Sequence, residues 1–145
     1  MKTRNIVVGT IAYTLSTFTL AIVWHIVLFK SLYVSFGYFT GEPNIALGFL
    51  TIAIQGFVLS ALYPLVKVTG TSIVRGLKFA AIVGVFFWTS HVLAFVAKQA
   101  VADPLLFVFM ESGYLCLQFG IYGALIGAIY SWGEGAAVQI VAPDI

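Results

Sequence analysis

Long uncharged stretches separate the few charged positions of this chain. Asp, Glu, Lys and Arg are all absent from residues 6–29, 43–66 and 79–97, and a single acidic residue, Glu111, interrupts residues 104–132. A transmembrane helix needs about 20 apolar residues to cross about 30 Å of hydrocarbon, and these runs lack the alternation of a membrane β-barrel strand. The pattern therefore predicts four transmembrane helices, at about residues 6–29, 43–66, 77–99 and 104–132.

The composition supports this assignment and excludes other classes of protein. Of the 145 residues, 61% are hydrophobic and 8% are charged, whereas a typical soluble chain is about 25% charged. The mean hydropathy is +1.08. The charge is too sparse for a nucleic-acid binder, and the single cysteine, Cys116, excludes a disulfide scaffold. We expect one transmembrane domain over residues 1–145, in contact with the lipid bilayer and not with nucleic acid.

The basic residues predict an orientation. Five fall on one side of the predicted membrane and two on the other: Lys2, Arg4, Lys67, Arg75 and Lys78 against Lys30 and Lys98. Because cytoplasmic loops carry an excess of Lys and Arg, we expect both termini in the cytoplasm and the chain in the cytoplasmic membrane. The apolar part of the first segment is longer than that of a signal peptide, so we expect it to remain as a helix.

Two halves of the chain resemble one another. Residues 54–63 align with residues 121–130 at identical Ile, Gly, Ala and Tyr positions, and His25 falls opposite His91 one residue out of that register. The similarity predicts two tandem helix hairpins, residues 1–66 and 67–133, related by a pseudo-twofold axis along the membrane normal. The expected fold is an all-α integral membrane protein, an antiparallel four-helix bundle in which the first and third helices lie diagonally.

Small residues one turn apart mark a packing surface on the even-numbered helices. They are Gly56 and Ser60 in the second helix and Gly123 and Gly127 in the fourth. Such pairs let helix backbones approach closely. We interpret them as contacts inside the bundle, with the seam of a homodimer as the alternative.

Three ionisable side chains lie inside the predicted spans: His25, His91 and Glu111. With a rise of 1.5 Å per residue, His25 lies about 7 Å below Lys30. By the same measure, His91 lies about 10 Å below Lys98, and Glu111 lies about 10 Å from the start of its helix. All three then occupy one layer in the outer half of the bilayer. Because ionisable groups inside hydrocarbon are costly, this layer is the candidate functional site.

Other polar residues extend this site. Lys98 is i+7 from His91, Gln118 is i+7 from Glu111, and Gln55 lies at mid-membrane depth. We expect a cavity entered from outside, with the two histidines and Glu111 on its wall and the two glutamines beneath. Residues 31–41 are rich in aromatic side chains, which favour the headgroup level. We therefore expect this loop to anchor at the outer membrane surface.

The residue types in the ionisable layer suit several chemistries. A His–Glu pair can exchange protons, since His titrates near neutral pH. Two imidazoles and a carboxylate can bind a transition metal, and histidines on two helices of a bundle can bind haem b. A purely structural alternative is that Glu111 bonds a histidine or Lys98 and fixes the packing. No catalytic motif favours an enzyme, because HExxH, CxxC and phosphate-binding glycine loops are absent from the sequence.

The leading functional interpretation is a small membrane protein that binds or permeates a small polar solute or ion at His25, His91 and Glu111. Four helices form a narrow bundle, so permeation would require a homodimer or a larger membrane complex. One alternative is a redox protein that binds a metal or haem b through His25 and His91. The other is a non-catalytic accessory or assembly subunit.

Overall fold

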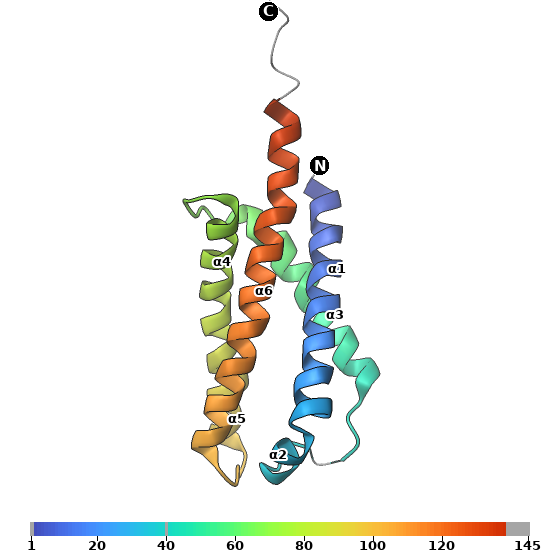
Figure 1. Cartoon of the computed structure of the whole chain (residues 1–145), viewed down its shortest axis with the longest axis vertical. Helices are drawn as coiled ribbons and strands as arrows, with labels where there is room; N and C mark the ends of the chain where they lie inside the picture. Colours follow the sequence, from blue (N-terminus) through green and yellow to red (C-terminus); the bar gives the residue numbers. More distant parts are fainter. Residues whose placement is uncertain (1, 40, 139–145) are drawn as a thin grey trace, which may run out of the picture.

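The computed structural model describes residues 2–39 and 41–138, with side chains at residues 3–39 and 41–132. Four helical stretches in this part of the chain are long and apolar enough to cross a membrane: Thr3–Leu28, Ile45–Leu65, Ser72–Lys98 and Pro104–Trp132. They lie close to the four spans that the sequence predicts. The chain is therefore all-helical in its described part and compatible with an integral membrane protein (Figure 1).

Several of these stretches are composite. Their segments, in chain order, are α1 (Lys2–Ala21), the π-helix η1 (Ile22–Leu28), α2 (Lys30–Ser35), α3 (Ile45–Leu62), the 3₁₀ turn η2 (Tyr63–Leu65), α4 (Ser72–Phe87), the π-helix η3 (Trp88–Leu93), α5 (Ala94–Lys98) and α6 (Pro104–Val138). The first and third long stretches thus each change from α to π geometry near the same end of the molecule.

The helix starts follow from capping side chains. The Asn44 side chain accepts a hydrogen bond from the backbone N–H of Leu47 at 3.0 Å, and Asp103 does the same for Leu106 at 3.0 Å. Both satisfy backbone donors that have no partner within the first helical turn. Pro104 follows at a position where its missing N–H costs nothing. These caps fix where α3 and α6 begin.

The third stretch begins at Ser72, earlier than the expected residue 77. The expectation started the helix next to the last basic residue of the loop, Lys78, but Arg75 and Lys78 both lie within α4. The Lys78 ammonium donates to the carbonyl of Thr69 at 2.9 Å. A lysine near a helix end can extend along the helix to the polar boundary, so its charge does not delay the start of the helix.

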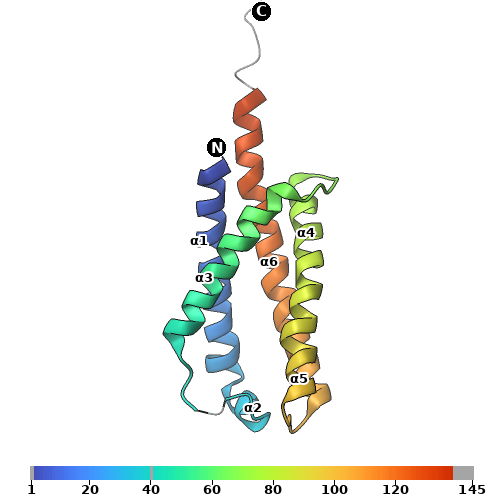
Figure 2. The ribbon, with the colours of Figure 1, turned by 180° about the vertical axis from the view of Figure 1, so that it is seen from behind.

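The long helices pack in a definite order. α6 lies between α1 and α4 and contacts both, while α3 packs against α1 and crosses obliquely (Figures 1 and 2). The connections at residues 29–39, 41–44 and 99–103 lie at one end of the molecule, which we call the α2 end. The N-terminus and the 66–71 loop lie at the other. α3 and α4 meet at this second end and diverge towards the α2 end. The pseudo-twofold repeat and the diagonal placement of helices stay predictions.

Glycines bring α4 and α6 into close contact. A Cβ atom added at Gly76 would collide with the backbone carbonyl oxygen of Gly123. One added at Gly127 would collide with the carbonyl oxygen of Ser72. These positions require a residue without a side chain, since the two backbones touch there.

The small residues of α3 also lie inside the bundle. A Cβ atom at Gly56 would fall 3.0 Å from the Tyr13 ring of α1, and Ser60 faces Gly9 of the same helix. Gly56, Ser60, Gly123 and Gly127 therefore all sit at contacts within one chain. A homodimer seam would have to use other surfaces.

The aromatic segment after the first span does not form the expected surface loop. Residues 30–35 are helical as α2, and the side chains of Tyr33 and Phe36 are buried. The Phe36 and Phe107 rings lie 5.6 Å apart, edge to face. The expected headgroup anchoring is wrong for these two rings, because folding back against α6 removes more of their apolar surface from both water and lipid headgroups.

A polar stripe runs along the inner face of α1 and η1. Every fourth residue from position 5 to position 25 is small or polar and faces the protein. These residues are Asn5, Gly9, Tyr13, Thr17, Ala21 and His25. On α6, Glu111, Gln118 and Tyr122 are likewise buried. The seam between the two helices is therefore polar, although both sequences are apolar overall.

Candidate functional site

Each of the two histidines lies in a π-helical segment. His25 belongs to η1 and His91 to η3. At the end of η1, the backbone N–H of Phe29 donates to the carbonyl of Trp24, five residues earlier, at 3.0 Å. π turns are rare, cost hydrogen-bond quality and occur frequently at functional sites. Here they mark both helices at the point where they face Glu111.

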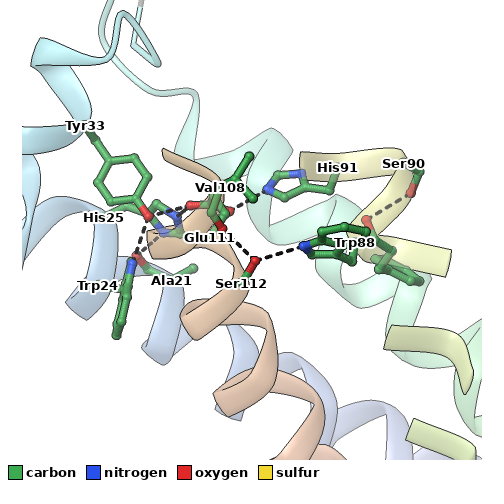
Figure 3. Close-up of polar contacts among 11 residues, drawn as sticks. Ala21, Trp24, His25, Tyr33, Trp88, Ser90, His91, Val108, Glu111 and Ser112 are labelled. Atoms are coloured by element: carbon green, nitrogen blue, oxygen red, sulfur yellow. Dashed lines mark hydrogen bonds and ion pairs between the residues drawn. The ribbon is translucent and has the colours of Figure 1, made fainter. Parts of the chain in front are cut away.

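The structure brings His25, His91 and Glu111 together (Figure 3). The Nε2 atom of His25 lies 2.9 Å from Oε1 of Glu111, and Nε2 of His91 lies 3.1 Å from Oε2. The Glu111 side chain is completely buried. One carboxyl group of α6 thus bridges two imidazoles that come from the first and third spans.

Tyr33 is a third partner of the carboxyl group. Its hydroxyl donates to Oε1 of Glu111 and accepts a hydrogen bond from Nε1 of Trp24 at 2.9 Å. Burial raises the pKa of the Tyr33 hydroxyl well above its usual range, with the nearby Glu111 charge as the next cause. The hydroxyl therefore stays protonated near neutral pH and remains a donor to the carboxylate.

The second nitrogen of His25 restricts where protons can lie. Nδ1 is 3.1 Å from the backbone carbonyl oxygen of Ala21, which can only accept, so this hydrogen bond requires a proton on Nδ1. His25 is then an imidazolium facing an ionised Glu111, or a neutral ring accepting a proton from a neutral Glu111. Both states place one proton between Nε2 and Oε1 and use the same heavy-atom geometry.

His91 is the exposed member of the cluster. Its side chain is 40% exposed, against 10% for that of His25. Beside it, Nε1 of Trp88 donates to the hydroxyl of Ser112 at 2.9 Å, which ties the start of η3 to α6 next to Glu111. His91 is therefore held against the cluster yet open on one side.

Gln55 and Gln118 form a separate layer nearer the middle of the spans. Nε2 of Gln118 donates to the Tyr13 hydroxyl at 2.8 Å, and this hydroxyl donates to Oε1 of Gln55 at 3.2 Å. Tyr13 thus joins α3 to α6 through α1. A third pair, Ser60 and Tyr122, follows with hydroxyl oxygens 3.3 Å apart.

A cavity of about 540 Å³ adjoins both layers. His25, His91, Gln55 and Gln118 contribute to its wall, while Glu111, which the sequence places on the wall with the histidines, does not line it. The cavity lies between α3 on one side and η3 on the other, with α1 and α6 as its floor. The exposed edge of His91 faces this space.

Lys98 is not part of the cluster. It is exposed at the end of α5, and no hydrogen bond or ion pair joins it to His91 or Glu111 in the described residues. The expectation that Lys98 shares a face with His91 assumed an α-helix between them. The wider turn of η3 changes that phase, since one residue corresponds to about 100° of rotation in an α-helix.

Sequence reasoning missed the tyrosines of the site. Tyr33 was assigned to the membrane surface, and nothing local shows that α2 folds back onto η1. Tyr13 had a detectable signal, because it lies on the same four-residue spacing as Thr17 and His25 along the first span. Reading that spacing as a buried polar face would have found it.

The geometry does not favour the metal and haem alternatives for His25, His91 and Glu111. Within the described residues, no group of three or more His, Cys, Asp or Glu side chains is arranged to hold a metal ion. Both imidazoles direct Nε2 at the carboxyl group, which lies between them where an axially bound iron would have to sit (Figure 3). A transition metal or haem b at this site stays a prediction.

Comparisons of the chain with protein-family models, with curated proteins and with solved structures give no match. Function must therefore be inferred from the contacts of the chain itself.

Proposed function

We propose that this chain is a membrane protein that binds and transfers protons at the cluster of Glu111, His25 and His91. The observation that carries the proposal is the double hydrogen bonding of His25, to Ala21 through Nδ1 and to Glu111 through Nε2. This arrangement requires one shared proton. It also lets that proton move from nitrogen to oxygen without rearrangement of the heavy atoms.

The charge of the cluster supports the same conclusion. The partners of Glu111 are the two histidines and Tyr33, with no Lys or Arg among them in the described part of the chain. With both imidazoles neutral, an ionised Glu111 would leave one negative charge in a medium of low dielectric constant, which is costly. One bound proton makes the cluster neutral. Gain and loss of this proton are therefore the changes that the proposed function requires.

The arrangement also provides a route. His91 is open to the cavity and reaches Glu111, which in turn reaches His25. Gln118, Tyr13 and Gln55 continue the polar seam towards the middle of the spans. Hydroxyl and imidazole groups can each donate and accept, so they suit relayed transfer with water molecules bridging the longer gaps.

Proton flux into liposomes containing the purified protein tests this function. We expect Glu111→Gln to reduce the flux under a pH gradient at least tenfold, because the amide cannot exchange a proton with either histidine. Glu42→Gln is the matched control: it makes the same chemical change at an exposed residue outside the spans and should leave the flux unchanged. Equal flux in Glu111→Gln and wild type would overturn the proposal, and so would a wild-type flux no higher than that of empty liposomes.

Nitrogen-15 NMR tests the shared proton directly, since the chain contains only two histidines. We expect one imidazole to show a strong hydrogen bond at both nitrogens in the wild type, with a proton shared at Nε2. The Glu111→Gln variant should convert it to an ordinary neutral ring, while His91→Gln should retain it. Two ordinary neutral rings in the wild type would contradict the shared proton.

A further inference from the structure

The cavity beside His91 is lined by residues of all four membrane-spanning stretches and of the connection between the first two. It lies between α3 and the η3 end of the third span. α3 diverges from α4 towards the α2 end (Figure 2). For a chain that spans a membrane, the surroundings of these helices are hydrocarbon. A ligand entering sideways would come from the lipid phase.

Five aromatic rings contribute to the cavity wall beside its aliphatic side chains. They come from α1, the 36–44 connection, α4 and α6, and are Phe18, Tyr38, Phe39, Phe87 and Tyr114. Aromatic side chains favour offset or edge-to-face contact with other rings. A flat ring can contact these five rings in that geometry, whereas a flexible acyl chain would pack mainly against the aliphatic part of the wall.

One wall residue has a hydroxyl in a weak hydrogen-bonding position. Thr17 lines the cavity and is buried, and its hydroxyl lies beside that of Tyr13 without forming a well-aligned hydrogen bond among the described residues. Neighbouring hydroxyls of α1 behave differently: Thr10 and Thr14 each donate to the carbonyl four residues earlier, at 2.7 and 2.8 Å. A buried hydroxyl without a well-aligned partner is costly. Thr17 can therefore bond a ligand in the cavity more strongly than it bonds Tyr13.

We propose that this cavity binds a lipid-soluble molecule that carries a flat aromatic or quinone ring and a hydrogen-bonding oxygen. Its volume lies within the usual range for small-molecule sites, about 300–1,000 Å³, which are mostly apolar with a few placed polar groups. The ring packs among the aromatic side chains, and Thr17 and the exposed edge of His91 supply the hydrogen bonds. The binding goes beyond the proposed proton transfer and does not depend on it.

Filling the cavity tests the proposal. Gly48 lies on its wall, and a Cβ atom there meets no atom within 4 Å. We expect Gly48→Trp to fold normally and to weaken the binding of a short-tailed benzoquinone at least tenfold, measured by calorimetric titration in detergent. Gly120→Trp is the matched control, since Gly120 of α6 is equally unobstructed and lies away from this cavity. Equal weakening by both variants, or no benzoquinone binding to the wild type, would overturn the proposal.

The polar contact is tested by removing a single hydroxyl. We expect Thr17→Val to weaken benzoquinone binding about five- to tenfold, the loss of one hydrogen bond, and Thr14→Val to leave it unchanged. If decanoic acid binds as tightly as the quinone, and Gly48→Trp weakens the binding of both equally, the cavity is an acyl-chain site and the ring assignment is wrong. Glu111→Gln should retain quinone binding even if proton flux is lost, so the two proposals can fail separately.

Discussion

Hydrogen bonds to Glu111 offset the cost of placing a carboxyl group in the interior of a membrane protein. Removing a charge from water costs several kcal/mol even after the protein relaxes. Glu111 receives three side-chain partners, and hydrogen bonds to charged groups contribute about 1.5–3 kcal/mol each. The partners therefore compensate for burial, but only while all of them stay in place.

Tyr33→Phe tests that balance. The substitution removes a donor to Glu111 and leaves the Trp24 indole N–H without its acceptor. We expect the free energy of unfolding, measured in mixed detergent micelles, to fall by about 1–3 kcal/mol. Tyr38→Phe makes the same change on a neighbouring ring that contributes ring contacts to the core, and it should cost less. A smaller loss for Tyr33→Phe than for Tyr38→Phe would argue against the hydrogen-bonded cluster.

Alkaline pH should affect the wild type more than Tyr33→Phe. Burial raises the pKa of Tyr33 above its ordinary value of 10.0, so above that pH the unfolded chain releases a proton that the folded chain retains. The stabilising contribution is thus complete below pH 10.0 and declines as the pH rises towards the folded-state pKa. The slope is at most about 1.4 kcal/mol per pH unit. If the unfolding free energies of the wild type and Tyr33→Phe fall by the same amount as the pH rises above 10, this assignment is contradicted.

At the scale of the helices, the two π segments determine which side chains meet. Each widens one turn beside a histidine, and His25 and His91 both reach Glu111 from there. The common depth of the three residues follows from their distance to the helix ends, which the sequence does contain. The direction in which Lys98 faces cannot be derived from the sequence. The π geometry of η3 changes the helical phase between His91 and Lys98, and it has no clear sequence signal.

The other elements show which features of the fold can be predicted from the sequence and which cannot. Uncharged runs locate all four spans because hydrocarbon thickness sets their length. The start of α4 was misplaced because Lys78 can lie inside a helix and still reach a polar partner. Tyr33 was misplaced because α2 packs onto distant parts of the chain, and such tertiary contacts leave no local pattern. Features set by the local sequence, such as the length of a span, could thus be predicted, and contacts between distant parts of the chain could not.

The α4–α6 contact gives a prediction at this scale. Gly76→Ala places a methyl group against the backbone of Gly123, so the helices must separate. We expect a loss of about 1–3 kcal/mol in unfolding free energy, typical of overpacking. Gly48→Ala meets no atom and should be neutral or stabilising by up to about 1 kcal/mol, since alanine favours the helix. Equal effects of the two variants in the same unfolding assay would show that α4 and α6 do not touch there.

For the whole molecule, the arrangement separates a packed part from an open one. α1, α6 and α4 enclose the polar seam and the ionisable cluster. α3 packs mainly on α1, and the cavity lies between α3 and η3. Many large apolar side chains of α3 are exposed, including Leu50, Ile54 and Phe57. In a membrane these face lipid or another subunit.

Orientation then determines the direction in which the cluster would exchange protons. The excess of basic residues at the N-terminal end predicts that the α2 end faces outward. In a Cys116→Ser background, a membrane-impermeant maleimide applied to intact cells should label Gly41→Cys, which lies in the exposed 36–44 connection. Thr69→Cys, in the loop at the opposite end, should react only after the membrane is permeabilised. The reverse pattern would place the cluster in the inner half of the bilayer, and His91 would then exchange protons nearer the cytoplasm.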